Sequence, residues 1–239
     1  MKDKAFRVLA IVPAYNEEKT ISEVILSIKQ LDFGIDILVI NDGSTDRTGM
    51  EAQKTEQALV VNLPANLGIG GAVQTGFKYA LRNNYDIAFQ FDGDGQHKAL
   101  EIKKIIGPVM DSEVDVVIGS RFLKKHNGFQ STVARRIGIK IFEYLNMALI
   151  HQRITDNTSG FRAYNRKAIG FMADNYPTDF PEPEAVILIG KNGFRMKEVF
   201  VSMAARDQGT SSINGFRPLY YMVKVILSIF MCASRRRLR

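Results

Sequence analysis

Short apolar segments alternate with amphipathic segments through the first half of the chain. Apolar runs at residues 6–12 and 35–40 are typical of strands buried on both faces. Between them, apolar residues recur at three- and four-residue spacing over residues 21–31, which predicts an amphipathic helix. The alternation continues with predicted strands at 59–63, 87–91 and 114–119 and predicted helices at 46–57, 70–82 and 100–110. Strands that alternate with helices predict an α/β fold with a mostly parallel sheet flanked by helices.

Polar residues follow each of the first four predicted strands. The strand ends carry Pro-Ala-Tyr-Asn-Glu-Glu at 13–18, Asn-Asp-Gly-Ser-Thr-Asp at 41–46, Asn-Leu-Gly-Ile-Gly-Gly at 66–71 and Asp-Gly-Asp-Gly-Gln-His at 92–97. Ligands of parallel sheets bind beyond the carboxyl ends of the strands, so chemistry is expected there. A dinucleotide-binding turn is excluded because Val73 stands where its third glycine belongs, and a P-loop ending in Gly-Lys-Ser/Thr is absent.

Asp92 and Asp94 flank a glycine at the end of an apolar strand. Alternation along an extended chain directs both carboxylates to the same side. Two neighbouring carboxylates repel each other unless a cation lies between them, and oxygen ligands with an amide such as Gln96 suit Mg²⁺ or Mn²⁺. The alternative is an Asp-Gly-Asp turn without a metal. His97 is interpreted as a hydrogen-bond partner of the carboxylates.

Composition restricts the class of protein. A chain of 239 residues with 46% hydrophobic and 24% charged residues is expected to fold as one large domain. Its single cysteine, Cys232, excludes an intramolecular disulfide. The net charge of +7 has two sources, a segment at 121–140 with six Lys or Arg and no acid, and an arginine cluster at 235–239. Both favour an anionic partner, which includes lipid headgroups, a phosphate-bearing substrate and nucleic acid.

The order of the strand-end motifs resembles that of family 2 glycosyltransferases with the GT-A (Rossmann-like) fold. The resemblance rests on residues 12–17, 41–46 and 92–97. Downstream, Gly-Ser-Arg-Phe at 119–122, Ser-Gly-Phe-Arg-Ala-Tyr at 159–164 and Tyr-Tyr-Met-Val-Lys at 220–224 are similar to the branch of dolichyl-phosphate mannose synthase and polyprenyl-phosphate glycosyltransferases. It implies an inverting enzyme that moves a sugar from a nucleotide-sugar to undecaprenyl or dolichyl phosphate. A UDP-sugar is favoured, with GDP-mannose left open.

The resemblance also implies roles for particular residues. Asp92, Asp94 and Gln96 would coordinate Mg²⁺ or Mn²⁺, and Arg206 would contact the donor diphosphate. The nucleotide-sugar would be bound by Pro13, Tyr15, Glu17, Asp42, Asn66 and Asp92, and the acceptor phosphate by Arg121, Arg135, Arg136 and Arg162. Asp92, Asp94, Arg121 and Arg206 would be the catalytic residues. An anionic acceptor phosphate needs no strong general base, so positioning and charge stabilisation can be sufficient. Glu182 and Glu184 are interpreted either as sugar or acceptor contacts or as an exposed turn.

The C-terminal segment is predicted to form an amphipathic helix. Residues 219–233 are almost wholly apolar, but fifteen residues of helix span only about 22 Å, which is less than the bilayer core. We therefore expect a catalytic domain at 1–217 and a basic interfacial helix and tail at 218–239 that lies in the membrane surface. The alternative is that this helix packs on the domain. With no signal peptide at the N-terminus, we expect a peripheral protein on the cytoplasmic face, with any flippase a separate chain.

Three other functions remain to be distinguished. The same fold can transfer sugar to a saccharide or a lipid-linked oligosaccharide, which would require neither the basic segment nor the terminal helix. A sugar nucleotidyltransferase would need a glycine-rich, basic phosphate loop near the N-terminus, and residues 13–16 are not one. A nucleic-acid binder accounts for the charge but leaves the strand-end carboxylates unexplained, since they repel phosphates. Nucleic acid is therefore not an expected partner.

Overall fold

A seven-stranded sheet lies at the centre of the protein, whose computed structural model describes residues 6–31, 33–123, 133–204 and 217–234. The strand order is β3-β2-β1-β4-β6-β5-β7. The strands are β1 (Val8–Ala14), β2 (Ile35–Asn41), β3 (Leu59–Asn62), β4 (Ile87–Gln90), β5 (Val116–Ser120), β6 (Arg162–Asn165) and β7 (Met196–Phe200). All five strands that the hydrophobic pattern predicts are present, and the prediction of a mostly parallel α/β sheet is confirmed.

Strand β6 interrupts the parallel order. It lies antiparallel between β4 and β5, and Ala163 is in register with Phe89 on one side and Val117 on the other. The strands β4 and β5 are therefore not neighbours, although they follow each other along the sequence. The sequence Arg-Ala-Tyr-Asn is too short and too polar to show a strand pattern. Its position matters for function because it brings residues 157–161 beside the end of β4.

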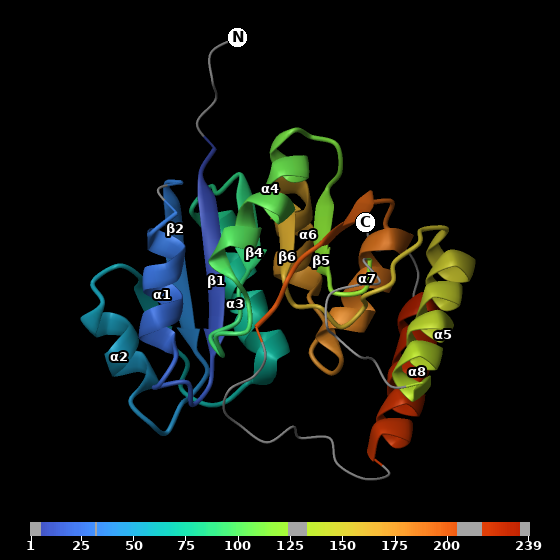
Figure 1. Ribbon diagram of the computed structural model, residues 1–239, viewed down its shortest axis with the longest axis horizontal. Helices are drawn as coiled ribbons and strands as arrows, with labels where there is room; N and C mark the ends of the chain where they lie inside the picture. The colour runs from blue at the N-terminus through green and yellow to red at the C-terminus, as the bar shows by residue number, and fades with distance from the viewer. Residues whose placement is uncertain (1–5, 32, 124–132, 205–216, 235–239) are drawn as a thin grey trace.

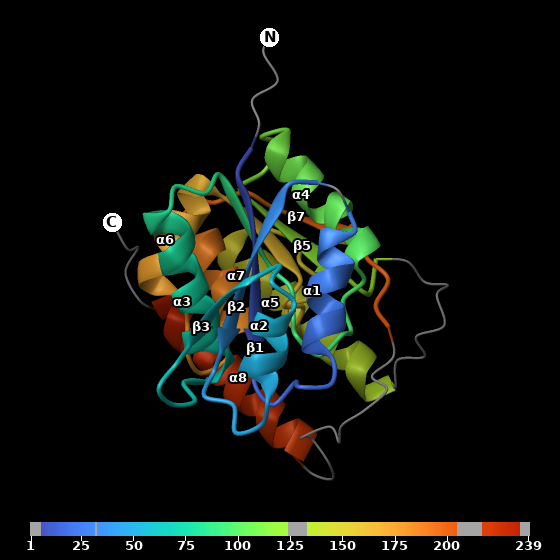
Figure 2. The same cartoon turned by 90° about the vertical axis from the view of Figure 1, so that its left-hand side faces the viewer.

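Helices cover both faces of the sheet (Figures 1 and 2). Leu9 and Ile11 of β1 belong to one hydrophobic cluster, whereas Ala10 and Val12 belong to the other, as the alternation of side chains along a strand requires. The helices are α1 (Ile21–Lys29), α2 (Thr48–Lys54) and α4 (Ile102–Met110) on one face, and α3 (Gly68–Arg82), α6 (Arg166–Asn175), α7 (Pro181–Lys191) and α8 (Arg217–Ser234) on the other, with α5 (Val133–Ile150) beside α7.

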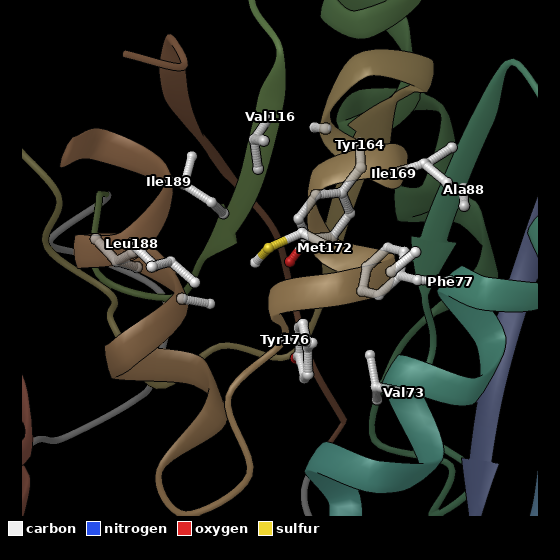
Figure 3. Packing of buried hydrophobic residues seen from close by; sticks show 14 of the residues in the cluster. Val73, Phe77, Ala88, Val116, Tyr164, Ile169, Met172, Tyr176, Leu188 and Ile189 are labelled. Carbon is white, nitrogen blue, oxygen red and sulfur yellow. The ribbon is translucent and has the colours of Figure 1, made fainter. Parts of the chain in front are cut away.

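Aromatic rings fill the core between α3, α6 and the sheet (Figure 3). The rings of Phe77 and Tyr164 meet edge to face with centroids 4.8 Å apart, and Tyr176 packs on the other side of Phe77 at 5.4 Å. A side chain at Gly76 would collide with Ile11, so α3 lies directly against β1. This close packing fixes the N-terminus of α3 at the carboxyl ends of β1 and β2.

The predicted C-terminal helix is present as α8, and one face of it belongs to the core. Val225, Ile229 and Cys232 are buried in the cluster that α3, α6 and α7 share. The expected boundary after residue 217 falls at the start of α8. The helix nevertheless packs against α7, which agrees with the alternative interpretation that it packs on the domain. Among the described residues, no helix combines the length and the apolar character that a bilayer crossing requires.

Candidate active site

Hydrogen bonds join the loops that follow β1 and β2. The backbone N–H of Asn16 donates to Ser44 Oγ at 3.0 Å, and Asn16 Oδ1 accepts from the backbone N–H of Thr45 at 2.9 Å. The backbone N–H of Glu17 donates to Thr48 Oγ1 at 2.7 Å. Asn16 has a φ of 57°, in the left-handed region that asparagine tolerates better than most residues. These contacts hold Tyr15 and Glu17 in place at the end of the sheet.

The end of β2 is joined in the same way to the loop after β3. Asp42 is buried, and its Oδ1 accepts from the backbone N–H of Leu67 at 2.8 Å. Gly43 has a φ of 67°, and a Cβ at this position would lie 2.6 Å from the backbone nitrogen of Asn66. Only glycine allows this approach without displacement of the neighbouring backbone. The contact sets the position of Asn66 relative to Asp42.

A cleft of about 360 Å³ lies where these loops meet. A second, larger hollow of about 1130 Å³ adjoins it, and Glu17 and Asp94 line both. The residues that were expected to bind the nucleotide-sugar come from the ends of four different segments, yet all of them line the smaller cleft: Pro13, Tyr15, Glu17, Asp42, Asn66 and Asp92, together with Asp94. The fold therefore brings these residues together.

The two carboxylates of the Asp-Gly-Asp turn lie in the wall of this cleft. Asp92 Oδ1 accepts from Gln90 Nε2 at 2.8 Å, and the backbone N–H of Asp92 donates to His97 Nδ1 at 3.0 Å. Asp94 Oδ1 accepts from the backbone N–H of Gln96 at 3.0 Å. The turn is attached to β1 because the Gly93 N–H donates to the Pro13 carbonyl, and to the start of α1 because Thr20 Oγ1 donates to the Gly93 carbonyl.

Asp92 and Asp94 fit a divalent cation that takes some of its ligands from the protein and the others from a substrate. The described residues contain no cluster of three or more His, Cys, Asp or Glu side chains that could enclose a metal ion. Mg²⁺ commonly takes one or two carboxylates from the protein and completes its shell with water and substrate phosphates. Two carboxylates facing one cleft match that mode of binding. Gln96 is not among the residues that line either hollow, so its expected role as a metal ligand stays a prediction.

His97 contributes to the site as a structural partner of Asp92. It is buried, its ring stacks on Phe161 with centroids 4.7 Å apart, and its edge faces Phe91 at 5.3 Å. Its Nε2 lies 3.6 Å from Asp92 Oδ2. Because Nδ1 accepts a backbone hydrogen bond, His97 holds the Asp-Gly-Asp turn to the core.

An ion pair stands at the end of β5. Arg121 donates to buried Asp156 through Nε and Nη2, each at 2.8 Å, and through its backbone N–H at 3.0 Å. Burial works against the charge of Arg121, but the hydrogen bonds to Asp156 and the negative charge of Asp156 and its neighbours together outweigh burial and raise the pKa of the guanidinium. Glu198 of β7 accepts from the backbone N–H groups of Thr155 and Asp156, which fixes the loop that carries the partner carboxylate.

Comparison with known proteins identifies the family. The pattern of glycosyl transferase family 2 matches residues 9–171, more than half of the chain. The chain belongs to glycosyltransferase family 2. It is 28% identical over 245 residues to a UDP-N-acetylglucosamine–dolichyl-phosphate N-acetylglucosaminyltransferase of Methanococcus voltae, covering 93% of this chain and 96% of the relative. It is 28% identical over 227 residues to a polyprenol monophosphomannose synthase of Mycolicibacterium smegmatis, covering 92% and 85%.

The fold agrees with that assignment. The structure superposes with a TM-score of 0.67 on glucosyl-3-phosphoglycerate synthase from Mycobacterium tuberculosis, crystallised with Mn²⁺, UDP-glucose and phosphoglyceric acid. The match covers 97% of this chain and 81% of the other at 21% identity, and it confirms the predicted GT-A fold. The protein is a family 2 glycosyltransferase, and it is similar to relatives named for dolichyl-phosphate and polyprenol acceptors.

Four arginines were expected to contact the acceptor phosphate, and the structure describes the side chains of only Arg121 and Arg162. Arg162 is buried, and its guanidinium donates to the carbonyls of Asn157, Ser159 and Glu182. This arrangement does not support the phosphate contact that the resemblance implied for Arg162, because its donors already have partners inside the protein. Arg135 and Arg136 belong to α5, but their side chains lie outside the described residues, as does Arg206.

Glu182 lies close to the charged groups of the site. It lies in the first turn of α7, and its carboxylate is near Arg162, Asp92 and Arg121. Burial raises the pKa of Glu182, and the neighbouring Arg162 guanidinium opposes that rise. Glu182 belongs to a helix and is not exposed, so the interpretation of residues 181–184 as an exposed turn is wrong for Glu182.

Several site residues carried no recognisable signal in the sequence. Asp156 and Glu198 lie on segments that the hydrophobic pattern does not distinguish, and the loop before β6 meets β7 only in the folded protein. Gln90 is different, because it is a polar residue inside the apolar run Ile-Ala-Phe-Gln-Phe at 87–91. That break in the pattern is a signal that could have identified it.

Proposed function

We propose that this glycosyltransferase moves a sugar from a nucleotide-sugar, a UDP-sugar or GDP-mannose, to a polyprenyl phosphate at the membrane surface, with inversion at the anomeric carbon. The observation that carries the proposal is the single cleft that gathers the six residues expected to bind the nucleotide-sugar: Pro13, Tyr15, Glu17, Asp42, Asn66 and Asp92. The relatives named for dolichyl phosphate and polyprenol support the lipid acceptor.

The donor is expected to lie in the cleft with its nucleoside against Pro13, Tyr15 and Asp42. Tyr15 is half-exposed, so its ring is available to a base, whereas the carboxylate of Asp42 is fixed by the Leu67 N–H. Asp92 and Asp94 then face the diphosphate. A divalent cation bound by these carboxylates would neutralise the leaving nucleoside diphosphate.

The acceptor phosphate is expected on the Arg121 side of Asp92. Asp156 and Thr158 engage Nε and Nη2 of Arg121, while Nη1 makes no hydrogen bond to the described residues. Asp156 thereby fixes the guanidinium plane and leaves an edge of it for an anion. An acceptor phosphate oxygen would attack the anomeric carbon as the bond to the nucleoside diphosphate breaks. Because the phosphate is already anionic, orientation and charge are sufficient without a strong base.

Exposed apolar side chains support contact with a lipid surface. On α8, the face opposite the core presents Leu227, Phe230 and Met231 to solvent, and α5 presents Tyr144 and Met147. Side chains of this kind partition favourably into the interfacial region of a bilayer. A peripheral position on the membrane would bring the site to the headgroup of a polyprenyl phosphate.

A transfer assay tests the proposal. Purified protein is incubated with UDP- or GDP-sugars, short polyprenyl phosphate and Mg²⁺ or Mn²⁺, and a glycosyl-phosphate lipid is expected. Asp94→Ala should abolish the product because it removes a carboxylate from the cleft, whereas Asp111→Ala, an exposed carboxylate after α4, should leave the rate unchanged. Full activity of the Asp94 variant, or of wild type in EDTA, would contradict the metal role. Product on a saccharide but not on the lipid would contradict the acceptor.

A further inference from the structure

Gln90 is a buried polar residue in the middle of the apolar core. Its side chain is 1% exposed, and its neighbours along the strand, Phe89 and Phe91, are buried in the hydrophobic cluster. Burial of an amide costs about 1–3 kcal/mol unless hydrogen bonds replace those made to water. Both ends of this amide have a partner: Nε2 donates to Asp92 Oδ1 at 2.8 Å, and Oε1 accepts from the hydroxyl of Tyr176 at 3.4 Å.

These two partners determine which way the amide faces. A carboxylate can only accept, so the Gln90 NH₂ must point to Asp92 and its carbonyl oxygen must point away. The only partner for that oxygen among the described residues is the phenol of Tyr176, which is itself buried. Burial raises the pKa of Tyr176, so its hydroxyl keeps the proton that it donates. Tyr176, Gln90 and Asp92 therefore form a chain with one direction of donation.

Gly160 packs against the side chains of Gln90 and Asp92. A Cβ at this glycine would lie 2.5 Å from Gln90 Nε2 and 3.2 Å from Asp92 Oδ2. The segment before β6 therefore packs closely on the amide and the carboxylate, and a side chain at residue 160 would displace them. Together with the hydrogen bond from the Asp92 backbone to His97, these contacts fix both the backbone and the carboxylate plane of Asp92.

We propose that Gln90, oriented by Tyr176, is a positioning residue that fixes the Asp92 carboxylate for binding a divalent cation. The inference rests on the proposed function, since it assumes that Asp92 is a metal ligand. Groups that orient a metal ligand commonly change metal affinity about 10- to 100-fold when they are removed. Gln90 cannot touch the cation or the substrate itself, because it is buried behind Asp92.

Binding of Mn²⁺ to the full chain in the presence of UDP, followed by electron paramagnetic resonance, tests this role without catalysis. Gln90→Leu keeps the approximate volume but removes both hydrogen bonds, and Mn²⁺ binding is expected to weaken about 10- to 100-fold. Tyr176→Phe removes only the donor that orients the amide, and a loss of about two- to tenfold is expected. If Gln90→Leu does not fold, Tyr176→Phe still tests the proposal.

Gln152→Leu is the matched control. Gln152 also uses both ends of its amide, donating to the Phe194 carbonyl and accepting from the Met196 N–H. It lies in the loop after α5, beside the start of β7, and does not line either hollow. Its loss is expected to lower the melting temperature while Mn²⁺ affinity stays at the wild-type value. Unchanged Mn²⁺ affinity in folded Gln90→Leu or Tyr176→Phe would overturn the positioning role. Absence of Mn²⁺ binding in wild type itself would instead overturn the proposed metal site.

Discussion

The guanidinium of Arg121 and the carboxylate of Asp156 form a two-point ion pair in which Asp156 is fully buried. The pair links the end of β5 to the loop before β6. Because Glu198 of β7 holds the same loop, three strands determine where Arg121 lies. The position of this arginine is therefore a property of the sheet and not of one loop.

We expect Arg121→Ala to lower the free energy of unfolding by about 3–5 kcal/mol, because it leaves the carboxylate of Asp156 buried without its partner. Arg153→Ala is the matched control: its ion pair with Glu143 is exposed, and its loss should cost about 1 kcal/mol or less. Denaturant unfolding of the three proteins measures the difference. Equal losses in the two variants would show that the buried pair has no special role.

The same substitution should affect the acceptor more than the donor. Arg121→Ala removes the Nη1 edge that we assign to the acceptor phosphate, so the KM for polyprenyl phosphate should rise or kcat should fall by about tenfold or more, while the Kd for UDP stays within about twofold. Steady-state kinetics and calorimetric titration with UDP check the two parts. An unchanged KM and kcat for the acceptor would refute the assignment.

Gly43→Ala should damage the donor cleft. The substitution places a residue with a Cβ at a φ of 67° and forces that Cβ against the backbone of residues 65 and 66. Gly34→Ala is a matched control, since Gly34 has a φ of 62° but no atom within 4 Å of the added Cβ. Both variants should lose about 1–2 kcal/mol from backbone strain, but only Gly43→Ala should also weaken UDP binding, by about tenfold. Equal UDP affinities in the two variants would contradict this account.

Substitutions on the exposed face of α8 should affect membrane binding, whereas substitutions on its buried face should affect stability. Phe230→Ser with Met231→Ser removes exposed apolar side chains, so sedimentation with anionic liposomes should decrease while thermal stability is unchanged. Ile229→Ala removes a buried side chain from the core and should lower stability by about 2–5 kcal/mol without weakening liposome binding of the folded protein. Retention of liposome binding in the double variant would argue against α8 as a membrane contact.

Tyr85 should make the protein sensitive to alkaline pH. Burial, followed by the hydrogen bond to Asp36, raises the pKa of Tyr85 from 10.0 to about 12. In the unfolded chain the phenol ionises near its ordinary value, so the stability from this group is complete below pH 10 and is lost as the pH rises towards 12. Between pH 9 and pH 11, unfolding free energy should fall more steeply in wild type than in Tyr85→Phe. Parallel profiles in denaturant titrations would contradict the shift.

The sequence by itself determined the five strands of the first half, the helices between them and the edge of the sheet at which the cleft lies. These features follow from local periodicity and from the rule that parallel strands place their carboxyl ends together. The expectation that Asp42, Asn66 and Asp92 share a site could be made without a structure, because each residue follows the carboxyl end of a predicted strand. Likewise, the resemblance identified the family from ordered motifs that are continuous in sequence.

Only the tertiary structure decided the remaining relationships. The sequence does not reveal that β6 lies antiparallel between β4 and β5, because pairing across more than seventy residues depends on packing and not on local pattern. That pairing buries Arg162, places Gly160 against Asp92 and brings Asp156 to Arg121. In the same way, the hydrophobic pattern of α8 fits either a membrane or a core, and the fit of Ile229 between neighbouring helices placed one face of it inside the protein.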